Sequence, residues 1–473
     1  MLGLFGTLNL ATTSLQTQMA GVEVAGNNLA NVNTPGYSRQ RVVIQNNISI
    51  PVSAGMEGTG ASVQAIQQIV DNLLNGQIQT QSSQTGYWNA QQSALQNVQT
   101  ALNEYLNSGD GADTGLSSKL SAFFKALSAV ATTPNATGNE TRQGLIGAAQ
   151  TLATAFQQIN SRTLDLRNAL DNSLTSQVSE ANQLITSIAS LNDQIANAET
   201  FTNGVANDLR DLRQQKLEEL SKYFNYQTDT NADGTVTLTW AGQTFVDGNQ
   251  TPNKLTTAVD TNTGMLQVWT TGNNNLMTGV PFGFSGGSLA GTANARDGGL
   301  ADLRNSINTL ATNLIAEFNA VHATGFNLAG GSGNAFFTGT NASDIAVNQA
   351  IATDPTLIQA SGVAGNPGDG SVALSLSRLA SSSFAALSNQ TFSSYYGQAV
   401  GQLGTELSNA NDQVDSQTSV AAMLANQRSA VSGVNLDEEM TSLMMYQRAY
   451  QASAHVVSTV DQMIQVLLGM GAG

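Results

Sequence analysis

The sequence predicts a mainly α-helical protein with an inserted β domain. Terminal coiled-coil helices, a bundle of long helices and an outer β domain are expected to be nested around paired N- and C-termini. Three observations predict this arrangement. Apolar residues recur every seven positions at both ends of the 473-residue chain, helical periodicity fills most of the interior, and residues 226–299 contain alternating stretches typical of β-strands.

The N-terminal stretch is predicted to be one helix of a coiled coil. Its main apolar row has the seven-residue spacing of such a seam, through Leu8, Leu15, Val22 and Leu29. A neighbouring row contains Ala11, Ala25 and Val32, with Gln18 as its one polar position. The helix should end in the sequence NNLANVNTPGY, since Pro35 lacks an N–H group and Gly36 accepts positive φ.

The C-terminal stretch carries a second seam of the same period. It runs through Leu436, Leu443, Tyr450, Val457 and Ile464, and it is flanked by Tyr446, Val460 and Leu467. Three acidic residues, 437–439, occupy the first turn, where the helix dipole favours negative charge. Periodicity alone is equally compatible with two helices that pack on an ordinary globular core.

Composition excludes several classes of partner. The formal net charge is −16 with only 17 Lys and Arg residues, which argues against binding to nucleic acid or to an anionic membrane. Charged residues make up only 11% of the chain, so its polar surface can pack against copies of itself without strong repulsion. The chain has no cysteine, no apolar run long enough to span a membrane, and no basic residue before Arg39 that could open a secretory signal.

The interior is predicted to alternate between helical and β-rich segments. Residues 1–60 and 431–473 should form the terminal domain, and 61–225 and 300–430 the helical bundle, whose segment 325–367 is Gly-rich and irregular. Residues 226–299 should form the inserted β domain. Within the bundle, a helical stripe is expected to begin at Ser62, a long helix to cover 141–199, and a hairpin to lie near Phe336.

Three motifs resemble chemical sites but lack essential parts. Asp229-x-Asn231-x-Asp233-Gly234 opens like a calcium loop, yet Trp240 stands where the bidentate acid belongs, so a plain Asx turn is expected. The G-x-S-x-G pattern around Ser285 needs a helix after it, and the sequence there indicates a loop. His322 and His455 are expected at helix surfaces or interfaces. The sequence therefore assigns no catalytic, cofactor-binding or metal-binding residue.

Both ends of the chain resemble the flagellar axial proteins, the family of rod, hook and hook–filament junction proteins. The resemblance rests on NNLANVNTPGY followed by Ser38-Arg39, and on the tail GVNLDEEMTSLMMYQRAYQASAHVVSTVDQMIQVL. Within the family, three features favour a junction protein over a hook protein. They are Tyr37-Ser38-Arg39, the run DLRDLRQ at 208–214, and the segment from Phe318 to Phe337.

The resemblance implies a structural, non-enzymatic role between hook and filament. The implied partners are the flagellar hook protein, the second junction protein (hook-associated protein 3), further copies of this chain, and a cytoplasmic export chaperone. It also implies an extracellular location in the flagellum, reached through type III export without a cleaved signal. The predicted chaperone-binding face consists of Tyr446, Tyr450, Val457 and Ile464. The predicted assembly interface consists of the two main seams together with Asn27, Asn28, Asn31, Pro35, Gly36 and Tyr37.

Some alternatives stay open from the sequence alone. The chain could be another axial protein such as a hook protein, a surface hydrolase that uses Ser285, or an adhesin that uses the β insert. For the axial reading, a lone helix of about thirty residues is marginal in water. We therefore expect the terminal helices to be mobile in the free monomer and to become ordered on assembly.

Overall fold

The computed structural model describes residues 3–52, 55–102, 115–135, 139–202, 204–261, 264–272, 277–278 and 285–471. The chain divides into two compact units. Unit 1 contains Met1–Thr85, Val178–Gly287 and Gln417–Gly473, and unit 2 contains Gly86–Gln177 and Ser288–Ser416. Three of the four boundaries fall within the long helices α2 (Asn72–Leu102), α4 (Glu140–Thr202) and α10 (Phe392–Ser432), and the fourth falls at the first residue of α6 (Gly287–Ala295). The three-domain division expected from the sequence uses other boundaries and stays a prediction.

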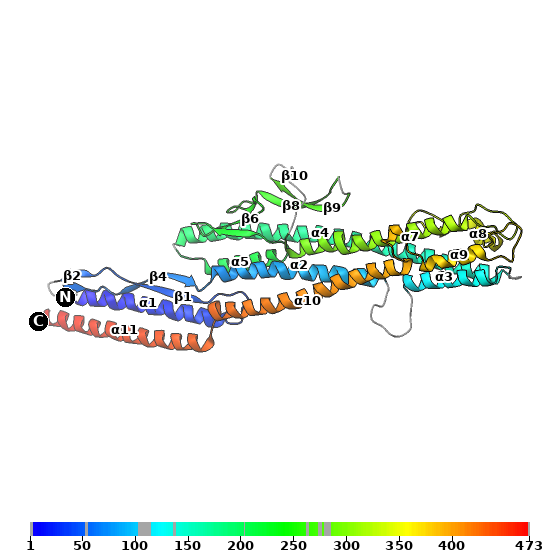
Figure 1. Cartoon of the computed structure of the whole chain (residues 1–473). Coiled ribbons are helices and arrows are strands. Elements are labelled where there is room, and N and C mark those ends of the chain that lie inside the picture. Colours follow the sequence, from blue (N-terminus) through cyan, green and yellow to red (C-terminus); the bar gives the residue numbers. More distant parts are fainter. Residues whose placement is uncertain are drawn as a thin grey trace. The chain divides into compact units, whose positions relative to one another are not determined.

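Unit 1 brings the two ends of the chain together. Helices α1 (Leu4–Ala30) and α11 (Leu436–Gly471) lie side by side and run in opposite directions (Figure 1). An antiparallel ribbon of β1 (Gln40–Asn46) and β4 (Ala61–Gln68) packs along α1. Beyond it, β2 (Ile50–Val52) and β3 (Gly55–Glu57) form a short antiparallel pair. The predicted mainly helical fold with long terminal helices is confirmed.

The helix expected from Ser62 was wrong at its start. Residues Ala61–Gln68 form strand β4, and α2 begins only at Asn72, where the Asp71 carboxylate accepts hydrogen bonds from the N–H groups of Leu73 and Leu74. The apolar spacing fits a helix, but β-branched side chains also fit a pleated ribbon. In the ribbon Ile66 pairs with Val42 and Val63 pairs with Ile44, so tertiary pairing decided between the two structures.

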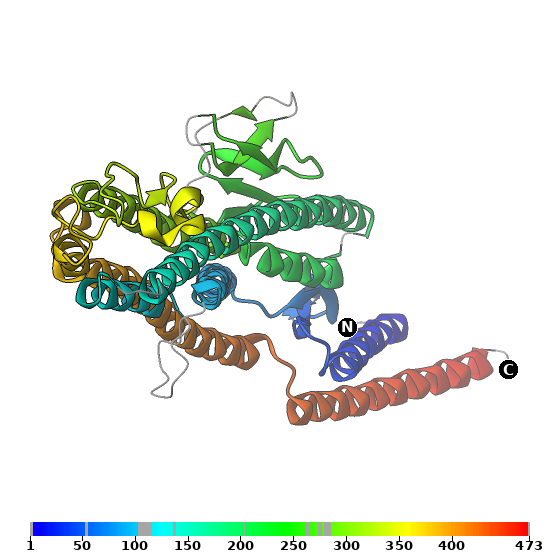
Figure 2. The same cartoon turned by 90° about the vertical axis from the view of Figure 1, so that its right-hand side faces the viewer.

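The inserted β region of unit 1 is small and consists of two three-stranded antiparallel sheets. One sheet has the order β5-β6-β7 and the other the order β10-β9-β8. The strands are β5 (Gln227–Thr230), β6 (Val236–Trp240), β7 (Gln243–Val246), β8 (Asn253–Val259), β9 (Leu266–Gly272) and β10 (Met277–Thr278). These strands, drawn in green, gather together in Figure 2.

Two asparagines of α4 attach these sheets to the helix. The Asn192 side chain donates to the Val236 carbonyl at 2.8 Å and accepts from the Val236 N–H at 3.1 Å. The Asn182 side chain makes the same pair of bonds with Leu255, at 2.8 and 3.0 Å. A side-chain amide carries one donor group and one acceptor, like the backbone, so each asparagine occupies the place of a neighbouring strand residue.

The calcium-like motif forms a turn between β5 and β6. Asp233 Oδ1 accepts hydrogen bonds from the N–H and the hydroxyl of Thr235, at 3.0 and 2.7 Å. The Gly234 N–H donates to the Asn231 carbonyl at 3.1 Å, and Gly234 has φ of 79°. The expected Asx turn is confirmed.

The next hairpin turn offers a stability test. Ala241 and Gly242, which connect β6 and β7, have φ of 47° and 77°. Alanine is disfavoured there by roughly 1 kcal/mol, whereas asparagine tolerates this region. We expect Ala241→Asn to raise the free energy of unfolding of the full chain by about 0.5 kcal/mol, measured in urea. Ala241→Val should lower it, because a β-branched side chain is strained at positive φ. A stabilising valine would contradict this explanation.

Unit 2 is built around a phenylalanine-rich core. Its helices besides parts of α2, α4 and α10 are α3 (Leu116–Thr132), α6 (Gly287–Ala295), α7 (Ala301–His322), α8 (Gln349–Thr353) and α9 (Ser371–Arg378), and a π-helical turn, Arg296–Leu300, joins α6 to α7. The rings of Phe123, Phe318, Phe336 and Phe337 contact one another with centroids 4.9–6.3 Å apart. The predicted hairpin near Phe336 is present as β11 (Phe337–Thr338) paired with β12 (Ala346–Val347).

His322 was wrongly expected at a surface or interface, since its side chain is fully buried in unit 2. Its Nε2 accepts a hydrogen bond from the Gln359 N–H at 3.0 Å, so the ring proton must lie on Nδ1, which is 2.9 Å from the Asn334 carbonyl oxygen. The ring also contacts Phe318 and Phe336. The pKa of His322 is lowered to about 4, chiefly by burial; the hydrogen bond to Asn334 opposes this shift and the positive charge of Arg142 contributes to it. His455, by contrast, lies exposed on α11.

This environment predicts that acid destabilises the protein. The folded pKa of His322 is about 4 and its ordinary value is 6.5, so the unfolded chain binds more protons between those pH values. The stabilisation from the neutral ring is complete above pH 6.5 and is lost as the pH falls toward 4, by about 3 kcal/mol. Urea unfolding across this range should show that loss, and the His455→Gln variant should keep it. An undiminished slope in His322→Leu would contradict the assignment.

Candidate assembly site

The contact between α1 and α11 repeats every seven residues. Asn28 Nδ2 donates to Glu439 Oε2 at 3.1 Å, and the hydroxyls of Ser14 and Ser453 are hydrogen-bonded at 2.9 Å. Between them, Gly21 lies under the ring of Tyr446, so close that a Cβ added to Gly21 would be 2.6 Å from a ring carbon. Each step of seven along α1 is matched by a step of seven back along α11. These three contacts define a single antiparallel register, and we call them the seam.

The predicted seam rows lie at the margins of this contact. On α1, Leu8, Leu15, Val22 and Leu29 are only half-buried. On α11, Leu443, Tyr446, Val457 and Ile464 are half-buried, while Leu436 and Tyr450 are 49% and 40% exposed. The positions of α1 that are fully buried are mostly small or polar, namely Ala11, Thr17, Gly21, Val24, Ala25 and Asn28. A role of the predicted rows in contacts with other chains stays a prediction.

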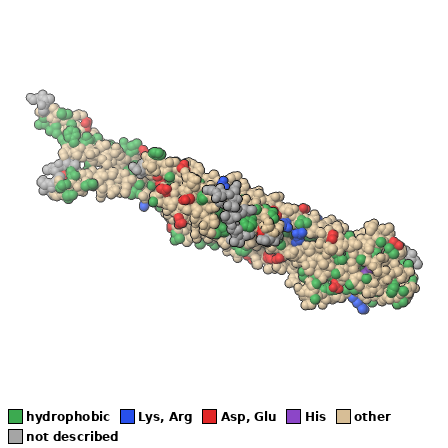
Figure 3. Space-filling model, turned by 90° about the horizontal axis from the view of Figure 1, so that it is seen from above, with side chains coloured by type: hydrophobic (Ala, Val, Ile, Leu, Met, Phe, Trp, Pro, Cys, Tyr) green, Lys and Arg blue, Asp and Glu red, His purple; other side chains and the backbone are tan. Residues whose placement is uncertain are grey.

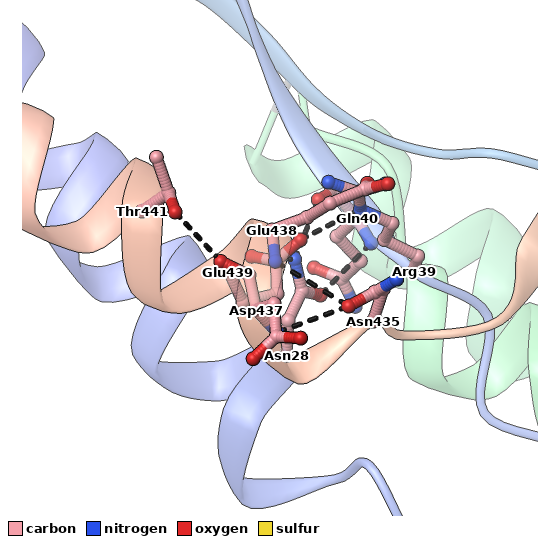
Figure 4. A network of polar contacts seen from close by, with 8 residues as sticks. All are labelled: Asn28, Arg39, Gln40, Asn435, Asp437, Glu438, Glu439 and Thr441. Carbon is pink, nitrogen blue, oxygen red and sulfur yellow. Dashed lines mark hydrogen bonds and ion pairs between the residues drawn. The ribbon is translucent and has the colours of Figure 1, made fainter.

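Asn28 is the centre of a polar network at one end of the seam. Its side chain is 1% exposed and makes four hydrogen bonds. Nδ2 donates to the Gln40 carbonyl at 2.8 Å and to Glu439, while Oδ1 accepts from the Gln40 N–H at 2.9 Å and from the Tyr37 hydroxyl at 2.8 Å. One side chain therefore connects α1 with the turn after it, strand β1 and helix α11. Figure 4 shows Asn28 with Gln40 and Glu439.

An ion-pair cluster surrounds this centre. Arg39 Nε is 2.6 Å from Glu439 Oε1, and Arg39 Nη1 is 2.8 Å from Glu438 Oε2. Glu439 is only 3% exposed, so its carboxylate is satisfied by Arg39 and Asn28 rather than by water. Asn435 caps α11, because its Oδ1 accepts from the N–H groups of Asp437 and Glu438 at 3.0 and 3.4 Å (Figure 4). We call Asn28, Tyr37, Arg39, Gln40 and Glu439 the hub.

The turn after α1 is fixed against α5 (Asn207–Ser221). Ser38 donates its N–H and its hydroxyl to the Asp211 carboxylate at 2.9 and 2.6 Å. Gln215 Nε2 donates to the Pro35 carbonyl at 2.8 Å. Gly36 has φ of 77°, which explains glycine there. Asn31 and Asn27 instead make local bonds, since Asn31 Nδ2 donates to the Asn27 carbonyl at 3.0 Å and to its side chain at 2.7 Å.

The DLRDLRQ run (208–214) on α5 connects the turn after α1 to the rest of unit 1. Besides Asp211, Asp208 Oδ1 accepts from Gln40 Nε2 at 3.2 Å. In the other direction, Arg210 pairs with Glu199 of α4 at 2.7 Å. The buried Arg213 donates from Nη1 to Asn192 Oδ1 and to the Gly234 carbonyl, both at 2.8 Å. One short helix therefore contacts the turn, α4 and the β5–β6 hairpin.

Burial sets the protonation of the groups around the hub. Burial raises the pKa of Tyr37 to about 12, and the carboxylates of Asp208, Asp211 and Glu439 add to this effect. The Tyr37 hydroxyl therefore keeps its proton at neutral pH and can donate to Asn28. Burial also raises the pKa of Asp211, and it lowers the pKa of Arg213 to about 10. The donors and acceptors of the hub bind one another, and these bonds hold the chain segments in place.

The sequence identified only part of this site. Asn28, Tyr37, Pro35 and Gly36 were predicted, and the structure brings Asn28 and Tyr37 into direct contact. Gln40 and Glu439 were not assigned as site residues, and Arg39 and Asp211 were noted only as parts of a resemblance. The one signal that could have selected Glu439 is its position seven residues before Tyr446, in the same row as Val460 and Leu467.

Ser285 and His322 each make hydrogen bonds within their own unit. Contrary to the expected loop, helix α6 begins at Gly287, directly after the pattern. Gly283 and Phe284 lie outside the described residues. The Ser285 side chain accepts a hydrogen bond from Asn225 Nδ2 at 2.6 Å. Both ring nitrogens of His322 are engaged within the core of unit 2, so neither is available as a base.

Of the helices within the described ranges, none combines the length and the apolar character needed to cross a lipid bilayer.

Three family models match the chain. The model described as "Flagellar hook-associated protein FlgK helical domain" matches residues 100–337, half of the chain. "Flagella basal body rod protein" matches residues 8–37, and "Flagellar basal body rod FlgEFG protein C-terminal" matches residues 425–470. The two rod-type matches coincide with α1 and its turn and with α11, the segments that the hub joins.

Curated relatives match over their whole length. Flagellar hook-associated protein 1 of Bacillus subtilis is 28% identical over 520 residues, which cover 100% of both chains. Flagellar hook-associated protein 1 of Salmonella typhimurium is 25% identical and covers 98% of this chain and 99% of its own. Among solved structures, the flagellar hook junction protein FlgK from Burkholderia pseudomallei has the same fold, with a TM-score of 0.64 over 76% of this chain and all of that chain, at 16% identity.

These findings agree with the geometry, in which helices α1 and α11 from the two ends of the chain pair with each other. The chain belongs to the FlgK family of flagellar hook-associated proteins, which are structural proteins of the bacterial flagellum.

Proposed function

We propose that this protein is an adaptor between the flagellar hook and filament and that it assembles through α1 and α11. The observation that supports this most directly is the incomplete burial of those helices. Their shared seam covers one face of each, and large apolar side chains stay exposed elsewhere. They include Phe5 and Met19 on α1 and Leu436, Met445, Val466, Leu467 and Leu468 on α11, with exposed fractions between 49% and 78%.

This exposure favours contacts with further protein chains. A helix that is apolar on most sides is normally buried, and large exposed apolar patches mark interaction sites. Charges would oppose such packing, but Glu23 is the only charged residue of α1, and Asp461 is the only one of α11 beyond Arg448. Copies of this helix pair arranged around an axis would bury the exposed apolar side chains and would complete the burial of the half-buried Leu8, Leu15 and Val22.

The proposed neighbours are the hook protein on one side and hook-associated protein 3 on the other. An asymmetric contact between successive chains that does not close on itself produces a helical array. We further propose that the subunit leaves the cell through the type III export route of the flagellum. The location between hook and filament follows from these partners.

The decisive experiment is a gene deletion followed by complementation. Cells that lack this protein should have hooks without filaments and should release filament subunits into the medium. The wild-type gene should restore filaments. Normal filaments in the deletion strain would reject the adaptor role, whereas loss of the hook itself would favour a hook protein.

A cytoplasmic chaperone is proposed to cover Tyr446, Tyr450, Val457 and Ile464 before export. In the folded chain Tyr446 is packed on Gly21, so the chaperone would bind α11 only while α11 is separated from α1. Removal of the chain from Asn435 onward should abolish co-purification with the chaperone. Unchanged co-purification would show that the chaperone binds elsewhere.

We also propose that the terminal helices become fully ordered only on assembly. The chain has no cysteine, so the double variant Ser14→Cys with Ser453→Cys introduces the only two thiols. The two hydroxyls are 2.9 Å apart, which places the thiols within reach of a disulfide if the seam is formed. Under the same oxidant, the disulfide should form several-fold faster in assembled subunits than in free ones. Equal rates would indicate a seam that is already rigid in the free chain.

A further inference from the structure

Helix α11 contains an uneven share of the methionines of this chain. Five of the eleven methionines lie on it, namely Met440, Met444, Met445, Met463 and Met470. All five are exposed, from 45% for Met440 and Met463 to 77% for Met470. The positions of α11 that are buried by the rest of the chain are Glu439 and Val460. We call the five methionines the methionine face.

The methionine face belongs to a surface of apolar character. Val456, Val466, Leu467 and Leu468 are exposed on the same helix. In Figure 3 hydrophobic side chains are visible at the end of the molecule where α1 and α11 lie in Figure 1, and few charged side chains are visible there. A thioether side chain adapts its shape easily to different neighbours. On assembly these side chains would lose their contact with water.

The same residues are chemically vulnerable in a free subunit. Because the chain has no cysteine, methionine is its most readily oxidised side chain. A peroxide transfers one oxygen atom to the thioether sulfur, which is oxidised by two electrons to a sulfoxide, while the peroxide is reduced to water or an alcohol. The sulfoxide is a polar acceptor, and burying it without a donor is unfavourable.

We propose that the methionine face is an oxidative modification site that controls whether the subunit can join the flagellum. A peroxide converts the free subunit to a form that assembles poorly. Methionine sulfoxide reductases reverse the change with a dithiol as reductant, which is oxidised to a disulfide while the sulfoxide oxygen leaves as water. Incorporated subunits are protected because their methionine face is covered. This inference rests on the proposed function, since it takes α11 to be an assembly surface.

The test uses the full-length purified subunit and hooks isolated from cells that lack it. Subunits are treated with graded hydrogen peroxide, the sulfoxide content of each α11 methionine is measured by mass spectrometry, and the fraction that sediments with hooks is determined. Complete oxidation of the methionine face should lower that fraction at least tenfold. Treatment with the two reductases, one for each sulfoxide epimer, and with excess dithiothreitol as the reductant should restore it to within twofold.

A matched variant separates this site from damage elsewhere. Leucine at all five positions and at the exposed Met19 of α1 removes the thioethers of the terminal helices with little change of volume, while the exposed Met56 and Met423 remain oxidisable. This variant should sediment with hooks equally well before and after peroxide. The proposal is overturned if fully oxidised wild-type subunits bind normally, if the leucine variant loses binding on oxidation as the wild type does, or if the reductases restore nothing. Untreated wild-type subunits that never bind hooks would instead reject the proposed function, and this inference with it.

Discussion

Gly21→Ala should weaken the pairing of α1 with α11, although alanine is the better helix former. A Cβ at this position would lie 2.6–2.8 Å from three atoms of the Tyr446 ring, closer than carbon atoms approach without strain. Either the ring must rotate or the helices must move apart, and overpacking of this kind costs about 1–3 kcal/mol. We expect incorporation into the flagellum to fall at least tenfold.

Gly26 provides the matched control on the same helix. A Cβ there would meet nothing within 4 Å, so Gly26→Ala should only gain the helix propensity of alanine, about 1 kcal/mol. Gly21→Ala should therefore weaken the pairing of α1 with α11, whereas Gly26→Ala should stabilise α1. The rate of disulfide formation between Ser14→Cys and Ser453→Cys measures the pairing in each background.

A second substitution identifies the cause. If the Tyr446 ring is the obstacle, Tyr446→Ala should restore most of the cross-linking that Gly21→Ala loses. Equal behaviour of Gly21→Ala and Gly26→Ala would show that the seam does not depend on the close approach at Gly21.

This close approach also explains what the sequence could and could not predict about the terminal helices. The seven-residue period correctly identified two long helices that pair. It placed the main row on the large residues Leu8, Leu15 and Val22, which give the strongest pattern but are only half-buried. Ala11 and Ala25 of the predicted neighbouring row are buried. Gly21, where the helices approach closely, was not identified, because small residues leave little hydrophobic signal in a sequence.

Other differences follow from interactions between distant segments. Residues 37–52 were expected to be extended from their β-branched residues. The stripe after Ser62 was nevertheless assigned to a helix, because local spacing does not show that it pairs with the strand Gln40–Asn46. His322 was expected at a surface because a buried histidine requires both Gln359 and Asn334 as partners. Such partners become apparent only once the fold brings segments together.

The residues of the hub could likewise be predicted only in part from the sequence. The helix dipole explains the three adjacent acids 437–439 equally well. Glu439 shares a seven-residue row with Tyr446, but only the folded chain shows that its side chain is buried and bonded to Arg39 and Asn28, whereas Glu438 is largely exposed. The asparagine-rich motif did predict Asn28, although not its four partners.

Asn28→Asp should disrupt the hub more than Asn28→Ala does. Alanine removes the four hydrogen bonds of a side chain that is 1% exposed, which should destabilise the terminal helices by about 2–4 kcal/mol. Aspartate keeps the shape but replaces the Nδ2 donor by an oxygen. That oxygen would face the Gln40 carbonyl and the Glu439 carboxylate, 2.8 and 3.1 Å from the present nitrogen, and like charges at this distance repel.

Acid and a second substitution should both relieve this repulsion. Protonation of the introduced carboxyl, whose ordinary pKa is about 3.9, removes its charge and supplies a donor. The defect of Asn28→Asp should therefore diminish near pH 4 relative to Asn28→Ala, even though protonation of the buried His322 lowers the stability of every variant there.

Glu439→Gln combined with Asn28→Asp should recover part of the pairing at neutral pH, because an amide can donate to the new carboxylate. Protease resistance of the terminal helices in assembled subunits measures these effects. An aspartate variant no worse than alanine at neutral pH would mean that the hub admits water and that Asn28 does not hold the chain ends together.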